Sequence, residues 1–332
     1  MLQTILRTAA AVAVTIVVFD TGAFASSPWQ RPTLAPAPAD NHLTAARAEL
    51  GRALFFDTRL SAKGSMSCAT CHNPALGWSD GLPTAVGHDM KVLTRSTPTI
   101  VNAAFNTLQM WDGRKASLEE QALGPFGADE QNLPLEVLEQ RVQSIAGYGP
   151  MFAAAYPGEP ITRTTIAKAI ASFERTVLSD DAPFDRWVAG DEAALSAAAR
   201  RGFDLFVGRA NCAACHQGFN FTDNGFHNIG VRDTGAADPG RFAIRKVASL
   251  QGAFKTPTLR DIALTAPYMH NGCYDTLEEV VEHYVRGGDV KDHLSPNLRP
   301  LDLSAQEKSE LVAFMRSLTS APRVVAIPAL PR

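Results

Sequence analysis

The sequence lacks the features that would direct a protein to nucleic acid or into a membrane. Its 31 basic and 34 acidic residues nearly balance, giving a net charge of −3. This balance offers no basic surface for nucleic acid and no acidic tail. Beyond residue 26, no apolar run reaches the roughly 20 residues needed to span a bilayer. We therefore expect no nucleic-acid partner and no membrane span in the mature chain.

Strand patterns are also scarce, because few segments alternate apolar and polar residues. Apolar residues recur instead at helical spacing over residues 44–56, 135–145, 161–177, 200–206, 277–284 and 305–318. With 332 residues and 45% hydrophobic content, the chain can form two cores of ordinary size. We predict an all-α fold with long loops.

The first 25 residues have the pattern of an export signal. Arg7 follows a short polar start, residues 9–19 are almost wholly apolar, and positions 23–25 offer the small residues that a signal peptidase reads. The apolar run is too short for an uncleaved membrane anchor. We predict that residues 1–25 are a signal peptide for export to the periplasm. A flexible lead-in, rich in proline and alanine, is expected over residues 26–42.

Cysteine is rare, and four of the five cysteines lie in two copies of one motif. The copies, each Cys-x-x-Cys-His, are Cys68, Cys71 and His72, and Cys212, Cys215 and His216. Two thiols about one helical turn apart can add to the two vinyl groups of a haem, and the adjacent histidine then ligates the iron. A zinc site would need further clusters of ligands, and a thiol-redox pair would not need the histidine twice. We predict two covalently attached c-type haems, with His72 and His216 as proximal ligands.

Each motif follows a short predicted helix, at residues 44–56 and 200–206. This repetition indicates an internal duplication of a haem-binding unit. We place the two cytochrome c-like domains at residues 43–185 and 186–322. Cys273 lies outside both motifs, and a small buried apolar residue is its simplest interpretation.

The group on the far side of each iron decides between an electron carrier and an enzyme. A strong sixth ligand closes the iron, whereas a weak or absent one leaves it reactive. The candidates by residue type are His88, His227, Met269, His270, His283 and Tyr284. Residue type alone leaves the choice among them open.

From Ala48 to about Leu318, the chain resembles the bacterial dihaem cytochrome c peroxidases, a superfamily that includes the MauG-type enzymes. Besides the haem motifs, the matching stretches include Leu54-Phe55-Phe56-Asp57, Val86-Gly87-His88, Thr97-Pro98-Thr99, Trp111-Asp112-Gly113-Arg114, Thr256-Pro257-Thr258 and Pro267-Tyr268-Met269-His270-Asn271-Gly272. The resemblance implies a peroxidatic haem in the first domain and an electron-transfer haem in the second.

The same resemblance implies roles around the first haem. His88 falls where the peroxidases keep a distal histidine that must leave the iron before peroxide binds; its alternative is an ordinary loop residue. Peroxide cleavage also needs a carboxylate that takes and returns a proton. Glu130 is the candidate, with Gln121 as its hydrogen-bonding companion. Counting without a gap puts Gln131 at that place instead, and a solvated surface position is the alternative for Glu130.

Between the haems, Trp111 matches the tryptophan that passes electrons in the family; the alternative is a packing role. The family also binds calcium between its domains, partly through main-chain carbonyl groups that match Thr265 and Pro267. Ser96 stands where that site usually has asparagine. Because calcium prefers several oxygen ligands, this substitution weakens the expectation of a calcium ion.

The second haem departs from the peroxidase pattern. The peroxidases place a methionine 14 residues after the histidine that matches His270, but this chain has Tyr284 there. Tyrosine is the MauG pattern, because a phenolate lowers the haem potential whereas a thioether raises it. Met269 is the alternative ligand.

Three functions follow from these features. The first is a dihaem peroxidase that reduces hydrogen peroxide with electrons from a small donor such as a cytochrome c or a cupredoxin, and His88 supports it. The second is a MauG-like oxidase that acts on residues of a partner protein, and Tyr284 supports it. The third, ranked last, is an electron carrier without catalysis, which would leave Gln121 and Glu130 unexplained.

Overall fold

The computed structural model describes residues 27–321 and 324–332, so the predicted signal peptide lies outside the described residues. Within them the fold is mostly helical, as the sequence predicts. A small antiparallel sheet pairs β1 (Phe226–His227) with β2 (Phe254–Lys255). Among the described helices, none combines the length and the apolar character needed to cross a membrane.

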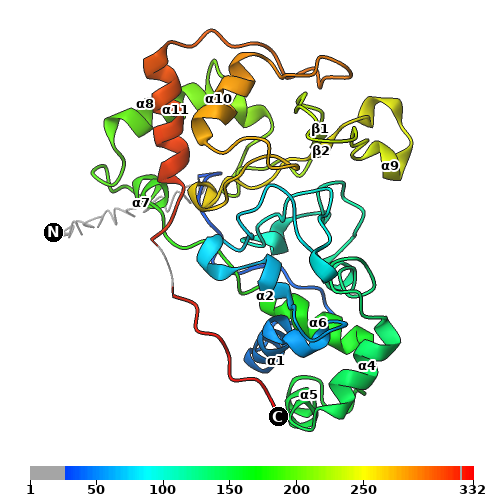
Figure 1. Cartoon of the computed structure of the whole chain (residues 1–332). Coiled ribbons are helices and arrows are strands. Elements are labelled where there is room, and N and C mark those ends of the chain that lie inside the picture. The colour runs from blue at the N-terminus through cyan, green and yellow to red at the C-terminus, as the bar shows by residue number, and fades with distance from the viewer. Residues whose placement is uncertain (1–26, 322–323) are drawn as a thin grey trace, which may run out of the picture.

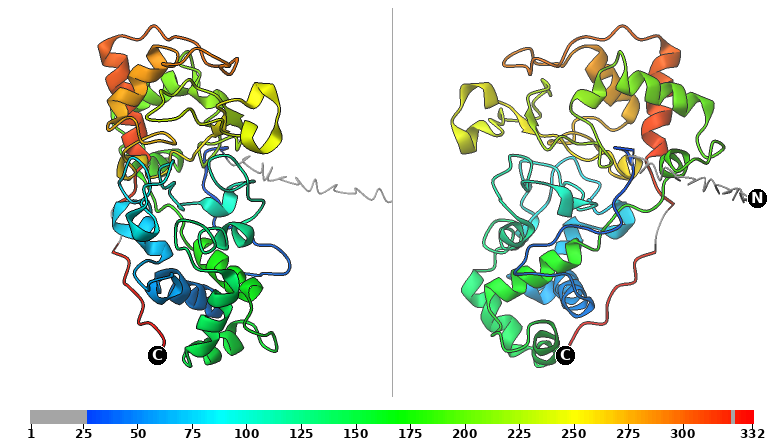
Figure 2. Two further views of the ribbon diagram at one scale, coloured as in Figure 1. Left: turned by 45° about the vertical axis from the view of Figure 1, so that its right-hand side comes forward. Right: turned by 180° about the vertical axis from the view of Figure 1, so that it is seen from behind.

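The helices form two groups, one above the other in Figure 1 and still separate in the views of Figure 2. The first group contains α1 (Ala45–Phe56), α2 (Cys68–Cys71), α3 (Leu118–Ala122), α4 (Leu135–Ser144), α5 (Tyr148–Ala155) and α6 (Arg163–Glu174). The second contains α7 (Pro183–Val188), α8 (Ala197–Val207), α9 (Phe242–Arg245), α10 (Leu277–Val285) and α11 (Ala305–Ser317). Each group has its own core of buried apolar residues; the first core ends at Val177 and the second begins at Phe184.

The six helices predicted from apolar spacing are confirmed, with ends that differ by at most three residues. The shorter helices α3, α5, α7 and α9 were not predicted, because helices of eight residues or fewer give too few apolar repeats to form a pattern. Their positions matter, because α3 carries Gln121 toward the site described below.

Each group is built around one pair of crossing helices, α1 with α6 and α8 with α11. Both crossings are made by a glycine. A Cβ atom on Gly51 would lie 1.8 Å from the carbonyl oxygen of Ala169, and one on Gly202 would lie 1.9 Å from that of Glu310. Because no side chain fits at either position, the two helix backbones can touch. The same close crossing thus occurs once in each group.

A second repeated feature is a pair of turns that follow the Thr-Pro-Thr sequences. Asn102 and Asp261 both have a left-handed backbone conformation, with φ of 58° and 56°. Farther along, Met110 and Met269 also have a left-handed backbone conformation, with φ of 72° and 73°. Each turn leads into a helix, α3 in the first group and α10 in the second. Loop geometry is therefore repeated as well as helix packing.

The two groups meet through polar contacts. Arg95 of the first group donates hydrogen bonds of 2.7 and 2.9 Å to Asp238 of the second, and one of 2.7 Å to Asp112 of its own group. Arg241 of the second group donates back to the carbonyl oxygens of Asp112 and Gly113, each over 2.7 Å. These bonds fix the interface on which the site depends.

We expect this interface to weaken in acid. Burial opposes the ionisation of Asp238, but the hydrogen bonds from Arg95 more than offset this and lower the pKa of Asp238. Burial likewise opposes ionisation of Asp112, whose pKa is lowered by Arg95 and Arg114. Because both pKa values lie below those of the unfolded chain, the stabilisation is complete above the ordinary aspartate pKa and is lost as the pH falls through the folded-state values.

Asp238→Asn should therefore lower the free energy of unfolding at pH 7 by about 2 kcal/mol, the typical contribution of hydrogen bonds to a charged group. It should also reduce the loss of stability between about pH 5 and pH 2. Urea unfolding at several pH values measures both effects. An acid-dependent loss in the variant as large as in the unmodified chain would contradict the role given to Asp238.

The segment over residues 27–42 contacts both groups. The ring of Trp29 stacks on Phe221 of the second group, with centroids 5.1 Å apart. Asn41, fully buried, donates hydrogen bonds to Glu119 and to the carbonyl oxygen of Lys168 in the first group, over 2.8 and 2.9 Å. Composition alone predicts a flexible lead-in here and does not reveal these contacts.

Candidate haem-binding active site

The first Cys-x-x-Cys-His motif forms a single helical turn. It is α2, and the N–H of His72 donates to the carbonyl oxygen of Cys68 over 2.8 Å. Nδ1 of His72 lies 3.1 Å from the carbonyl oxygen of Trp78. Because a carbonyl oxygen only accepts, Nδ1 carries the proton, and Nε2 keeps its electron pair for a metal. Two thiols and an oriented imidazole on one turn fit a covalently bound haem.

The second motif repeats this geometry. The N–H of His216 donates to the carbonyl oxygen of Cys212 over 2.9 Å, and Nδ1 of His216 lies 2.9 Å from the carbonyl oxygen of Phe221. The two accepting residues, Trp78 and Phe221, both have left-handed backbones, with φ of 61° and 50°. Both imidazoles are therefore held in the same tautomer by the same contact.

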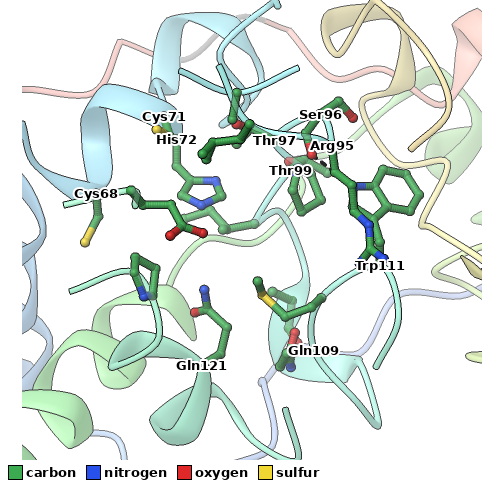
Figure 3. A pocket seen from close by; sticks show the side chains of 18 of the residues that line it. Cys68, Cys71, His72, Arg95, Ser96, Thr97, Thr99, Gln109, Trp111 and Gln121 are labelled. Atoms are coloured by element: carbon green, nitrogen blue, oxygen red, sulfur yellow. Dashed lines mark hydrogen bonds between the residues drawn. The ribbon is translucent and has the colours of Figure 1, made fainter. Parts of the chain in front are cut away.

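A cavity of about 730 Å³ opens beside the first motif (Figure 3). His72 projects into it from one side, Gln121 faces His72 from the opposite side, and Trp111 lies at one end. The second group contributes Lys255, Pro257, Thr258, Ile262, Thr265, Pro267, Tyr268 and Met269 to its wall. The volume is that of a small-molecule site, and the cavity extends to the interface between the two groups.

Glu130 and Gln131, the two candidates for the acid–base position, both line this cavity. Gln131 is the more deeply buried, with 4% of its surface exposed, and its Nε2 donates to the sulfur of Cys68 over 3.7 Å. Glu130 is half-buried. Among the described residues, Oε1 of Gln131 has no hydrogen-bond partner. An amide thus occupies the deeper position, and a carboxylate lies next to it.

His88 stands apart from these residues. Its side chain does not line the cavity, and its Nε2 lies 3.5 Å from a carboxylate oxygen of Asp89. The backbone N–H of His88 donates to the carbonyl oxygens of Asp129 and Glu130, over 2.9 and 3.0 Å. In this conformation the backbone of His88 anchors the loop that carries Glu130, and its role as a distal ligand stays a prediction.

Trp111 lies where the two groups of helices meet. Its indole N–H donates to the carbonyl oxygen of Ser96 over 3.0 Å, and its own carbonyl oxygen accepts from the N–H of Lys255 over 2.8 Å. Its ring stands nearly perpendicular to that of His270, with centroids 6.5 Å apart. An oxidisable ring at the cavity wall and at the interface suits electron transfer between the groups.

Tyr284 lies in the last turn of α10, close enough to Cys212 and Cys215 to interact electrostatically with both. Burial, followed by these two thiols, raises the pKa of the Tyr284 phenol above its usual value. The phenol therefore keeps its proton here, and a metal cation held at the second motif would favour the phenolate. Met269, the alternative ligand, lines the cavity of the first motif instead. The structure thus brings Tyr284, and not Met269, to the second haem motif.

The helices α3 and α10 explain why the two motifs have different surroundings. Both begin at a capping hydroxyl, Ser117 for α3 and Thr276 for α10, which accepts a backbone hydrogen bond from the third residue of its helix. After that, α3 ends with its fifth residue, whereas α10 continues to its ninth. The four extra residues amount to one turn, and that turn carries Tyr284.

Comparison with known proteins agrees with this arrangement. The family model for di-haem cytochrome c peroxidases matches residues 45–193. Over 305 residues the chain is 47% identical to the methylamine utilization protein MauG of Methylorubrum extorquens, covering 91% of this chain and 86% of that protein. The chain belongs to the di-haem cytochrome c peroxidase family. It is accordingly an oxidoreductase, and its family implies haem c as the cofactor.

The relatives include both kinds of enzyme found in the di-haem peroxidase family. The cytochrome c551 peroxidase of Pseudomonas aeruginosa is 38% identical over 292 residues, covering 85% of this chain and 81% of that protein. Among solved structures, a MauG-like protein associated with microbial copper homeostasis superposes with a TM-score of 0.81 at 35% identity, covering 88% of this chain and 95% of that chain. Membership of the family therefore leaves open whether this protein is a peroxidase or a MauG-like oxidase.

The residues expected to bind calcium form an incomplete set of ligands. Thr265 and Pro267 line the cavity close to the interface, together with Ser96. The hydroxyl of Ser96 already donates to the carbonyl oxygen of Met269 over 3.0 Å. Two carbonyl groups and an engaged hydroxyl are fewer than the six to eight oxygen ligands that calcium takes. Calcium stays a prediction.

One further cluster has a composition typical of a metal site. Ligand atoms of Cys215, Asp223 and His227 lie within 4.8 Å of one another. However, Cys215 belongs to the second haem motif, and Nε2 of His227 already bonds to Asp223 over 2.8 Å. We therefore interpret His227 and Asp223 as a supporting pair beside the second haem motif.

Two buried charged residues of the cavity wall, Lys255 and Glu174, were not singled out by the sequence. Lys255 is 8% exposed, and burial lowers its pKa to about 8. Lys255 stands directly before Thr256-Pro257, just as Ser96 stands directly before Thr97-Pro98. This repeated sequence is the signal that could have revealed Lys255. The other residue, Glu174, lies in the last turn of α6 with 3% of its surface exposed.

Proposed function

We propose that this protein is a MauG-like di-haem oxidase that uses hydrogen peroxide to oxidise residues of a partner protein. The main support is Tyr284, which lies beside Cys212 and Cys215 while Met269 lines the other site. An oxygen ligand lowers the potential of a haem, which favours holding oxidising equivalents over passing electrons. The position of His88 outside the cavity agrees with this choice over the peroxidase.

In this proposal each half of the chain holds one haem, and the halves arose by duplication. Supports are the repeated glycine crossings at Gly51 and Gly202 and the matching contacts of His72 and His216. When bound, the haems supply the redox centres at which peroxide is reduced and its oxidising power is kept. We place the enzyme in the periplasm, because the first 25 residues have the pattern of an export signal.

The residues of the cavity orient peroxide and move its protons. The amide of Gln121 faces His72 across the cavity and can hydrogen-bond to a small oxygen substrate there. Gln131 can do the same but cannot exchange a proton, since an amide does not titrate in this range. Proton transfer is therefore assigned to Glu130, which is half-buried at the cavity wall and in reach of solvent.

Electrons reach the cavity from the second half through Trp111 in this proposal. The indole is held at the interface by its bond to Ser96, and its backbone is bonded to Lys255. The final source of electrons is a residue on the surface of a partner protein.

A cytochrome c peroxidase is the second candidate, with a small donor such as a cytochrome c or a cupredoxin. It is favoured by His88, whose loop is bonded to the loop of Glu130 and whose Nδ1 has no hydrogen-bond partner among the described residues. A change in this loop would be needed to bring the imidazole to the cavity.

One experiment separates these functions. The haem-loaded protein receives one equivalent of hydrogen peroxide without any donor, and its visible spectrum is followed. A MauG-like oxidase should show a change in both haems that persists until a reductant is added. Trp111→Phe should slow the appearance of the spectral change at the second haem. Trp187→Phe should not slow it, because Trp187 only packs against the second core. A change that appears only after prior reduction would support the peroxidase, and an inert spectrum would support an electron carrier.

A further inference from the structure

Glu174 is a buried carboxyl group for which the proposed function has no use. It lines the cavity beside His72, and 3% of its surface is exposed. Among the described residues, its Oε2 has no hydrogen-bond partner. A buried polar atom without a partner costs free energy and calls for an explanation.

The repeat within the chain shows that packing is not that explanation. Phe173 of α6 contacts Phe55 of α1 with ring centroids 5.0 Å apart, and Phe314 of α11 contacts Phe206 of α8 at 4.9 Å. The next residue is Glu174 in the first group and methionine 315 in the second. An apolar side chain therefore fills this place in the second group, whereas the first group has a carboxyl group.

The surroundings of Glu174 favour its neutral form over the carboxylate and bring its titration close to neutral pH. Burial raises its pKa to about 8, Arg175 lowers it and Glu119 raises it. Arg175 is already bonded to Glu119 over 2.8 and 3.2 Å, so much of its charge is compensated. On α2, Cys68 lies close enough for Glu174 to raise the pKa of the thiol. Glu130 and Lys255 line the same cavity from other segments.

We propose that Glu174 is a second proton-exchanging group of the first haem site, distinct from Glu130 and linked to the redox state: it takes up one proton from solvent when the haem gains one electron and releases it when the haem is oxidised. The inference rests on the proposed function only in placing a haem at His72. A carboxylate inside a poorly solvated cavity stabilises the more positive, oxidised iron, and an added electron favours the neutral acid. Electron and proton then move together, and the charge of the cavity stays constant.

The test is the midpoint potential of the His72 haem against pH, from about pH 6 to pH 9, in the haem-loaded protein without peroxide. The potential should fall as the pH rises through the pKa of Glu174, because the carboxylate stabilises oxidised iron. Glu174→Gln keeps the shape of the side chain and should remove this part of the slope. Glu174→Met, which installs the residue of the second group, should do the same. Glu49→Gln on α1, where the side chain is 65% exposed, should keep the full slope.

Two further measurements identify the group. The infrared difference spectrum between oxidised and reduced protein should contain a protonated-carboxyl band that Glu174→Gln abolishes. Lys255→Met should remove a separate part of the slope and leave this band in place, because Lys255 also titrates near the middle of this range. An unchanged slope and band in Glu174→Gln with both haems attached would overturn the inference alone. A chain that binds no covalent haem, shown by a pyridine haemochrome assay, would overturn the proposed function instead.

Discussion

Tyr284→Phe should leave the second haem attached but remove the oxygen ligand that we propose for it. The predicted attachment uses Cys212, Cys215 and His216, which the substitution leaves in place. The oxidised state formed by peroxide without a donor should then decay faster, by roughly 100-fold or more, since even outer partners of metal ligands typically contribute 10–100-fold. Stopped-flow absorption measures this lifetime, and electron paramagnetic resonance reports the ligands of the second iron.

The matched control is Tyr156→Phe, which removes the same hydroxyl from a buried tyrosine of the first core. That hydroxyl donates to Asn41 over 3.2 Å, and Tyr156 does not line the cavity beside His72. In Tyr156→Phe the lifetime of the oxidised state should stay within about twofold of that in the unmodified protein. The lost neutral hydrogen bond contributes only ~1 kcal/mol, and it contributes to folding. If Tyr284→Phe leaves the spectrum of the second haem unchanged while Met269→Leu alters it, the ligand assignment is wrong.

Alanine at either helix crossing should be among the most destabilising substitutions in the chain. In Gly51→Ala the new methyl group would lie 1.8 Å from the carbonyl oxygen of Ala169, and in Gly202→Ala it would lie 1.9 Å from that of Glu310. The obstacle in both cases is backbone, so the helices must separate. Overpacking commonly costs 1–3 kcal/mol, and we expect at least about 3 kcal/mol here because no side chain can move away.

Gly149→Ala is the control for these substitutions. It also lies in a helix, α5, but a Cβ atom there would meet nothing within 4 Å. It should raise the free energy of unfolding by roughly 0.5–1 kcal/mol, through helix propensity and a less flexible unfolded chain. Urea unfolding monitored by circular dichroism ranks the three variants. A loss in Gly51→Ala no greater than the change in Gly149→Ala would show that the crossing can open freely.

The sequence predicts those features that local patterns determine. Apolar spacing locates the six longer helices, because a helix with one buried face must repeat apolar residues every three to four positions. The two haem motifs are also local, since the thiols and the imidazole must share one turn. The contacts of His72 with Trp78 and of His216 with Phe221 then follow within a few residues of each motif.

What could not be predicted depends on segments distant in the sequence. Glu174 faces the cavity only because α6 crosses α1 ahead of the first motif, and Lys255 reaches it from the other half of the chain. The relative depth of Glu130 and Gln131 is set by the loop that His88 holds through its backbone. Apolar spacing carries no information about any of these arrangements, and composition likewise gives no sign that Asn41 is buried.

The unequal lengths of α3 and α10 bear on how two similarly built halves can have different sites. The first motif borders a cavity and α3 ends after five residues, whereas α10 continues to its ninth residue and brings the phenol of Tyr284 near the second motif. In the proposed function, the reactivity of the first half would therefore come from a shorter helix, with the helices that surround the motif kept the same. Redesign can test this difference: lengthening α3 by one turn should bring a side chain beside the first motif, and trimming α10 by one turn should remove Tyr284 from the second.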